Sequence, residues 1–216
     1  MFRLDADATG LNARARTLKA FETAQSGLLV GTQIVAKGHD FPDVTLGVVL
    51  DADQTLRFPD FRAEERTFAL ITQLAGRAGR GAGGGRVLVQ TLAPSARSIR
   101  FAAAHDSDGF LEDELEQRRA LGYPPFSSLI RIVCSAVDAG AASTAAGRLA
   151  AEIDVPGASV LGPAPLFALR GRARSQVVVK AGDREAAIAA VGEAVDALAR
   201  GRTAKGVNIS VDVDPQ

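Results

Sequence analysis

Two short stretches of the chain hold the residues whose types and spacing are best suited to chemistry. The first is GTQIVAKGHDFP at residues 31–42, and it opens with Gly31 and Thr32 at the end of an apolar run. A glycine followed by a hydroxyl side chain at a turn lets a phosphate group approach the main chain closely. In the same stretch, Lys37 is either a phosphate contact or a solvated charge, and His39 is more typical of a turn residue than of a catalyst.

The second stretch is QLAGRAGR at residues 73–80, which places Arg77 and Arg80 three positions apart where a helix is expected to end. The neighbouring glycines keep the surface low, so both guanidinium groups can reach an anion. An arginine beside the terminal phosphate of a nucleotide would stabilise the charge that develops during hydrolysis. Either stretch alone could be an ordinary glycine-rich turn, but the two together indicate phosphate chemistry.

A third candidate is basic rather than glycine-rich. In LRGRARSQ at residues 169–176, the arginines Arg170, Arg172 and Arg174 alternate along an expected hairpin arm that leads into the strand VVVK. Three arginines so close together could contact the phosphates of a nucleic acid. The alternative is an ordinary solvated loop, and the sequence leaves both interpretations open.

The elements that position the first two stretches follow an α/β pattern. The unbroken apolar runs GLLVGTQ and VTLGVVLD are typical of strands buried on both faces of a parallel sheet. A helix is predicted to begin at Asp60 as its N-cap, with Glu64 and Glu65 in the first turn, where the helix dipole favours carboxylates. The layered α/β lobe is expected to span residues 1–92, with a helix at 12–24 and strands at 27–33, 44–51 and 86–91.

A helical linker is predicted at residues 93–126, with a break at Gly109 and an end at Pro124 and Pro125. Tyr123 and Phe126 in this linker could stack on a base, although packing at the domain junction is the favoured interpretation. The remainder, residues 127–216, is predicted to be a small ferredoxin-like (split βαβ) α+β domain. Its expected strands are 129–135, 159–161, 175–180 and 207–213, and its expected helices are 141–153 and 184–199.

Composition sets few limits on function. The 216 residues contain 25 Lys and Arg against 25 Asp and Glu, so net charge neither supports nor excludes a nucleic-acid partner. Cys134 is the single cysteine, which fits a reducing, cytoplasmic setting and excludes a disulfide within the chain. No run approaches the ~20 apolar residues of a membrane span, and the first ten residues lack the apolar core of a signal peptide.

The same stretches carry a family resemblance. GTQIVAKGHDFP resembles motif V and QLAGRAGR resembles motif VI of superfamily 2 helicases, in the form found in the PriA family. Further similar segments are RLDADAT at 3–9, the whole of 50–80, the region 116–126, LGPAP at 161–165 and VDVDP at 211–215, so the resemblance covers essentially the whole chain. It implies a partial RecA-like helicase lobe 2 followed by a PriA-type C-terminal domain.

The resemblance also implies roles for individual residues. Gly31, Thr32 and Lys37 would contact DNA, as would Arg170, Arg172 and Arg174; Gly38 and Asp40 would face the nucleotide cleft; and Gln73, Arg77 and Arg80 would face ATP, with Arg80 as the arginine finger. Because the chain opens inside the second lobe, an uncovered apolar edge and self-association are also expected.

For the intact protein, the resemblance implies an ATP-dependent 3′–5′ DNA helicase of replication restart that uses ATP and Mg²⁺. Its partners would be forked or single-stranded DNA, primosome proteins and single-stranded DNA-binding protein. This chain contains neither a GxxxxGK[ST] P-loop nor a DExH motif, so alone it is expected to be inactive, and Cys134 cannot supply the family's zinc ligands. The alternative is a non-catalytic DNA- or protein-binding scaffold of the primosome.

Overall fold

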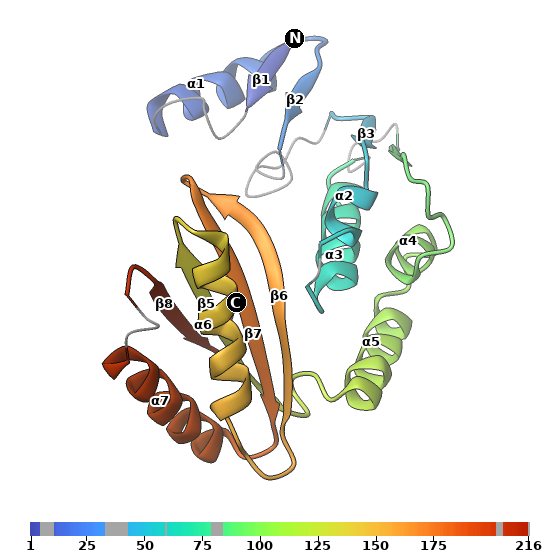
Figure 1. Ribbon diagram of the computed structural model, residues 1–216. Helices are drawn as coiled ribbons and strands as arrows, with labels where there is room; N and C mark the ends of the chain where they lie inside the picture. Colours follow the sequence, from blue (N-terminus) through green and yellow to red (C-terminus); the bar gives the residue numbers. More distant parts are fainter. Residues whose placement is uncertain (5–10, 33–42, 59, 79–83, 202–204, 216) are drawn as a thin grey trace. The chain divides into compact units, whose positions relative to one another are not determined.

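A computed structural model of the chain describes residues 1–4, 11–32, 43–58, 60–78, 84–201 and 205–215, and it divides into two compact units (Figure 1). The first unit comprises Met1–Glu114 and the second Leu115–Gln216. In the first unit the elements are β1 (Phe2–Leu4), α1 (Leu11–Glu22), β2 (Leu29–Gly31), β3 (Leu46–Val49), α2 (Asp53–Leu56), α3 (Ala63–Ala75), β4 (Arg86–Val89) and α4 (Arg97–Ala103). Helix α5 (Ser107–Leu121) carries the boundary between the units.

Parallel pairing joins the strands of the first unit, as their apolar runs predict. Strand β1 pairs with β2, and β3 pairs with β4. Helix α1 packs against β1 through an edge-to-face contact of the Phe2 and Phe21 rings, whose centroids lie 5.5 Å apart. Helix α3 packs on β3 and β4 around a core that is centred on Phe68 and Phe110, whose rings stack at 4.1 Å.

One face of the β3–β4 sheet is exposed. Along β3 the residues alternate between exposed and buried, so Leu46 and Val48 are exposed while Val49 is buried. Leu88 on β4 lies opposite Val48 in the register and is also exposed. The apolar run predicts a strand that is buried on both faces. Among the described residues, only one face of this sheet is buried.

Two local predictions for this unit are wrong. The N-cap of α3 is Arg62 rather than Asp60, because the Asp60 carboxylate accepts a hydrogen bond from the Arg62 N–H before the helix begins. Gly109 does not break the helical linker, because it lies in the first turn of α5, where its N–H donates to the Asp106 carboxylate. The interruption falls earlier, at His105, which has a positive φ of 54°.

The second unit is built around one four-stranded antiparallel sheet. Its elements are β5 (Ser128–Ala136), α6 (Ala139–Glu152), β6 (Ser159–Leu169), β7 (Arg172–Ala181), α7 (Arg184–Arg200) and β8 (Asn208–Val213). The strand order is β6-β7-β5-β8, which is the split βαβ arrangement and confirms the predicted fold class. Each helix starts at an aspartate whose side chain accepts a backbone N–H, Asp138 for α6 and Asp183 for α7.

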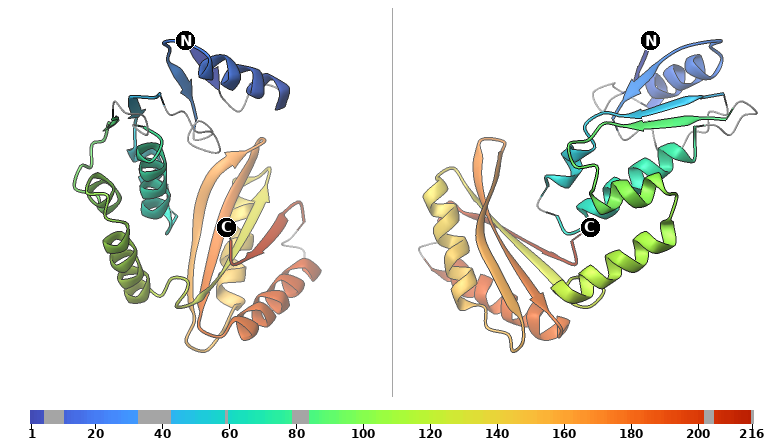
Figure 2. Two further views of the ribbon diagram at one scale, coloured as in Figure 1. Left: turned by 180° about the vertical axis from the view of Figure 1, so that it is seen from behind. Right: turned by 90° about the vertical axis from the view of Figure 1, so that its right-hand side faces the viewer.

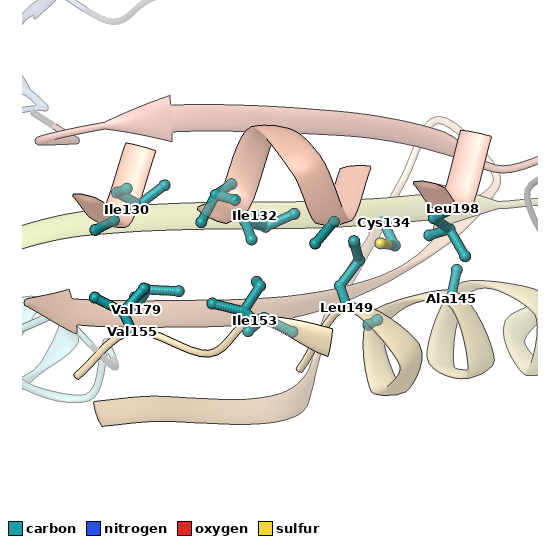
Figure 3. Packing of buried hydrophobic residues seen from close by; sticks show 14 of the residues in the cluster. Ile130, Ile132, Cys134, Ala145, Leu149, Ile153, Val155, Val179 and Leu198 are labelled. Carbon is teal, nitrogen blue, oxygen red and sulfur yellow. The ribbon is translucent and has the colours of Figure 1, made fainter. Parts of the chain in front are cut away.

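Both helices cover the same face of this sheet (Figure 2). Alternate residues of β5 and β7 point into the core that the helices close, among them Ile132, Cys134 and Val177, all fully buried. Leu149 of α6 and Leu198 of α7 complete the packing (Figure 3). The opposite face carries the intervening residues of each strand, and the helices leave it uncovered.

Strand β6 is much longer than the predicted 159–161, because it continues to Leu169. Pro163 and Pro165 argue against a strand in the sequence, since proline donates no hydrogen bond to a sheet. They are accepted here because β6 is an edge strand with only β7 as a partner. The register of β6 against β7 shifts within the LGPAP segment, between Leu161 and Ala164.

Candidate functional site

The C-terminal end of α3 presents the first group of candidate residues. Gln73 lies on the exposed side of the helix, two positions after the buried Ile71. Arg77 follows the helix in a turn, and its N–H donates to the Leu74 carbonyl at 3.1 Å. The carbonyl groups at a helix C-terminus carry partial negative charge, which favours an arginine there. Gln73 and Arg77 are therefore brought to the same end of one helix, as the spacing predicts.

A glycine on β3 sets how closely this end of α3 approaches the sheet. A Cβ atom added at Gly47 would lie 2.8 Å from Cγ of Leu74 and 3.1 and 3.2 Å from its two methyl carbons. No ordinary Cβ contact is that short, so any larger residue at position 47 must displace Leu74. Leu74 is adjacent to Gln73. The absence of a side chain at Gly47 therefore allows the close packing of α3 on β3 that positions the candidate site.

Two aspartates hold the segment between β3 and α3. Asp53, at the start of α2, accepts hydrogen bonds from the Leu92 N–H and the Thr91 hydroxyl, both at 2.8 Å. The Leu92 hydrogen bond is the main cause of a lowered Asp53 pKa, which burial opposes and the Thr91 hydroxyl reinforces. These hydrogen bonds connect α2, which precedes α3, to the segment that follows β4.

Asp60 plays the corresponding part at the start of α3. Partial burial would raise the pKa of Asp60, but the hydrogen bond from the Arg62 N–H and the charges of Arg62 and Arg66 outweigh it, so the pKa is lowered. The Arg66 guanidinium lies 2.9 Å from the carboxylate. Sequence reasoning missed Asp53, whose partners Thr91 and Leu92 are far away in sequence, and it assigned Asp60 to the start of this helix but as the N-cap.

The motif V candidates are only partly described. Gly31 ends β2 and Thr32 follows it, and both residues are exposed. Lys37, Gly38, His39 and Asp40 lie outside the described residues, as does Arg80 of the second stretch. The predictions made for those five residues therefore remain predictions.

In the second unit, the three arginines of LRGRARSQ lie at the tip and along the second strand of the β6–β7 hairpin, as predicted. They do not have the same environment. Arg172 donates hydrogen bonds to the carbonyl oxygens of Ser135 at 2.9 Å and Gly206 at 3.2 Å. Among the described residues, the side chains of Arg170 and Arg174 make no hydrogen bond or ion pair. Arg172 is thus engaged by the fold, and the other two are available for a ligand.

The helix-free face of the sheet extends this basic surface. The register places Arg174 of β7 opposite Ser135 of β5, and Arg131 opposite Val178, so these residues share the face that carries no helix. The Arg131 guanidinium lies 2.9 Å from the Asp212 carboxylate of β8. Lys180 reaches the face at the other end of β7 and donates to the Leu121 carbonyl at 2.8 Å. Sequence reasoning missed Arg131 and Lys180, although the alternation of β5 and β7 could have assigned both to one face.

The two aromatic residues of the linker are occupied within the second unit. The Lys180 ammonium group lies 4.6 Å from the centroid of the Tyr123 ring, and the Arg119 guanidinium lies 4.5 Å from that of Phe126. Cation–π contacts of this kind stabilise the position of both partners. A base could not stack on the ring face that the cation covers, which favours a packing role for both rings.

No metal site emerges from the part of the chain that is described. Among those residues no group of three or more His, Cys, Asp or Glu side chains is placed to hold a metal ion. Cys134 is fully buried in β5, and burial raises the pKa of its thiol to about 11, so the thiolate that zinc requires is disfavoured. The cysteine thus does not fit a zinc ligand. Of the helices described, none is long and apolar enough to cross a membrane.

In comparison with known proteins, two family models match successive parts of the chain, with residues 83–118 between them. The helicase conserved C-terminal domain matches residues 3–82, and the primosomal protein N C-terminal domain matches residues 119–216. The replication restart protein PriA of Bacillus subtilis (strain 168) is 37% identical over 221 residues, which cover 100% of this chain and 28% of that protein.

Two other relatives agree. The replication restart protein PriA of Treponema pallidum (strain Nichols) is 37% identical over 219 residues, covering 99% of this chain and 33% of the relative. The protein of the same name from Chlamydia muridarum (strain MoPn / Nigg) is 47% identical over 132 residues, covering 61% of this chain and 18% of the relative. The chain thus spans about a third or less of the curated relatives that it matches.

Proposed function

The chain belongs to the PriA family of replication restart proteins and corresponds to a C-terminal portion of such a protein, and on this basis we propose that it supplies part of the second lobe of an ATP-driven DNA motor. The intact enzyme moves 3′ to 5′ on forked or single-stranded DNA in the cytoplasm and takes part in primosome assembly with its protein partners. The first unit contributes residues to ATP hydrolysis and to the DNA track. The second unit recognises DNA.

The observation that carries the motor assignment is the arrangement at the end of α3. The buried side of α3 is fixed by Phe68 and Ile71, while Gln73 is exposed and Arg77 follows in a turn. An arginine whose backbone is fixed just beyond the end of a packed helix can be directed to the γ-phosphate of a nucleotide bound by another lobe, because only its side chain must then be ordered. In this proposal Gln73 and Arg77 orient the phosphates, and Arg80 stabilises the transition-state charge as the arginine finger.

The nucleotide and its Mg²⁺ would be held mainly elsewhere in the intact protein, because the 216 residues contain no P-loop. Gly38 and Asp40 would line the cleft from this side, and Gly31, Thr32 and Lys37 would contact the DNA strand. The chain alone is therefore proposed to bind DNA without hydrolysing ATP. Exposure of Gly31 and Thr32 at the end of β2 supports the assignment of the DNA track.

The proposed DNA-recognition role of the second unit rests on the different environments of the three hairpin arginines. Arg170 and Arg174 are available for phosphate contacts, whereas Arg172 holds the hairpin to neighbouring carbonyl groups. A phosphate contact adds affinity that falls with salt, because each one releases counterions from the DNA. Substitution of Arg170 and Arg174 is thus a cleaner test of DNA contact than any change that includes Arg172.

The test of the motor is a graft. This chain replaces the matching segment of the Bacillus subtilis relative, and DNA-stimulated ATP hydrolysis of the chimaera is compared with that of Arg80→Ala, Arg77→Ala and Arg86→Ala variants. Loss of an arginine finger lowers kcat by roughly a thousandfold or more, so the first variant is expected to be inactive. Arg86 is exposed on β4 of the same unit and is the matched control, with activity unchanged.

Two results would overturn the motor assignment. Hydrolysis that survives both Arg77→Ala and Arg80→Ala would show that these arginines do not act at the phosphates. A chimaera that folds and binds forked DNA but never hydrolyses ATP would instead support the alternative function, a non-catalytic scaffold of the primosome.

A further inference from the structure

The tip of the β6–β7 hairpin exposes two large apolar side chains. Phe167 is 87% exposed and Leu169 is 56% exposed. Single apolar residues are common on protein surfaces and need no explanation. Two of them within three positions, one an aromatic ring that lies almost entirely in solvent, form a small apolar surface at the end of a regular element. Such a surface is stabilised when a ligand covers it.

A β-bulge presents the aromatic ring. The register of β6 against β7 shifts between Leu166 and Leu169, so that Phe167 and Ala168 together lie opposite the single residue Ala173. A bulge of this kind bends an edge strand and turns a side chain in a new direction, often beside a functional site. The bulge in the backbone of β6 therefore accounts for the exposure of Phe167.

The hairpin tip is also held in place. The turn consists of Arg170 and Gly171 with φ angles of 51° and 72°, the left-handed values that a tight two-residue hairpin requires. Directly after it, Arg172 donates to the carbonyl groups of Ser135 and Gly206, which ties the tip to β5 and to the turn before β8. A ligand that binds the tip thus meets a preorganised surface and loses little affinity to ordering it.

The two arginines that flank this apolar surface determine the class of ligand. Arg170 lies in the turn and Arg174 lies opposite Leu166, and within the described residues neither has a charged partner. Their pairing with an exposed phenyl ring matches a ligand that is both anionic and flat. A nucleotide has these two properties, since its phosphate binds guanidinium groups and its base stacks on an aromatic face.

We propose that Phe167 stacks against an exposed nucleobase and Leu169 packs beside that base, while Arg170 and Arg174 contact the neighbouring phosphates. The proposal rests on the proposed function of the second unit in DNA recognition and deepens it, since it assigns to the hairpin tip the reading of an uncovered base. An uncovered base face occurs on an unpaired strand and at the end of a duplex, and both offer the same chemistry.

The test compares DNA molecules that differ only in their bases. Binding of the full chain is measured by fluorescence anisotropy on a fork with a single-stranded 3′ tail and on the same fork with an abasic tail of equal length. The two tails carry the same phosphates. Phe167→Ala is expected to weaken binding to the first fork by roughly 5- to 100-fold and to leave the abasic fork nearly unchanged, since stacking requires the base.

A blunt duplex and a single-stranded oligonucleotide identify the source of the base. A loss confined to the blunt duplex assigns the tip to a terminal base pair, and a loss confined to the oligonucleotide assigns it to an unpaired strand. Quenching of a 2-aminopurine placed in the affected DNA, lost in Phe167→Ala and retained in Phe167→Trp, reports the stacking directly.

Leu115→Ala is the control, because Leu115 is an exposed apolar residue on α5 of the same unit, outside the hairpin, and should not alter DNA binding. The melting temperature of Phe167→Ala should equal that of the parent chain, since the ring is mostly in solvent. A second pair of variants removes two charges each: Arg170→Ala/Arg174→Ala from the tip, and Arg148→Ala/Arg200→Ala from exposed helix positions of the same unit.

The outcomes separate this proposal from the function on which it rests. If only the tip arginine pair weakens binding and Phe167→Ala does not, DNA recognition by the tip stands and base stacking is wrong. An equal loss on the tailed and abasic forks also overturns stacking. If the parent chain binds none of the four DNA molecules, the proposed DNA recognition fails as well.

Discussion

Replacing Gly47 by alanine should disturb the candidate ATP site without touching any of its residues. The added Cβ would lie 2.8 Å from Cγ of Leu74, whereas carbon atoms in contact are about 3.5 to 4.0 Å apart. A displacement of about 1 Å is therefore needed. Leu74 is a neighbour of Gln73 and lies three residues before Arg77, so a shift of α3 would carry both candidate residues with it.

The expected cost has two parts. Overpacking of this kind lowers the free energy of unfolding by about 1 to 3 kcal/mol, measured by chemical denaturation of the chain. A displacement of about 1 Å at catalytic groups lowers the rate up to about 100-fold, measured as kcat for ATP in the grafted protein. Ile71→Val is the matched control, because it loosens the same helix by about 1 kcal/mol without pushing it.

A second substitution isolates the cause. Leu74→Ala removes the three atoms that the new Cβ would meet, so the double variant Gly47→Ala/Leu74→Ala should lose less stability than the sum of the single variants. It should also recover part of the lost activity. Additive effects of the two substitutions would refute the steric reasoning, as would a Gly47→Ala protein whose kcat matches that of Ile71→Val.

Two further predictions concern single side chains. The pKa of Asp53 is lowered in the folded chain from 3.8, so its contribution to stability is present above that value and is lost as pH falls through the folded pKa. Asp53→Asn should therefore lower the melting temperature at pH 7, with the difference from the parent shrinking as the pH is taken below about 4; an unchanged difference at low pH would contradict the assignment. Cys134 is fully buried and its pKa is raised to about 11, so at pH 8 a thiol reagent should label it only as fast as the second unit unfolds, and rapid labelling of the native chain would contradict its burial.

The fold of the second unit could be predicted from the sequence because its signals are local. Alternating apolar residues mark β5 and β7, and aspartates mark the starts of α6 and α7. The extent of β6 could not be predicted, since Pro163 and Pro165 are compatible with a strand only at a sheet edge. Edge position is a property of the assembled sheet and is absent from the local sequence.

The candidate site was predictable to a similar degree. The placement of Gln73 and Arg77 at the end of α3 follows from the helical spacing of the buried residues before them. Gly47 and Asp53 were missed because each acts on a residue far away in sequence, Leu74 in one case and Leu92 in the other. Neither motif matching nor periodicity reports such pairs.

The arginines of the hairpin show why the number of basic residues in a stretch of sequence does not give the number of phosphate contacts. Counted from the sequence, Arg170, Arg172 and Arg174 offer three phosphate contacts. The structure leaves two, because Arg172 already donates to the carbonyl groups of Ser135 and Gly206, which lie 37 and 34 residues away along the chain. Each phosphate contact adds about 0.7 to 0.9 to the slope of log K against log salt, so the tip should contribute a slope nearer to two contacts than to three. The third arginine contributes by keeping the tip rigid, which lets the other two bind without first being ordered.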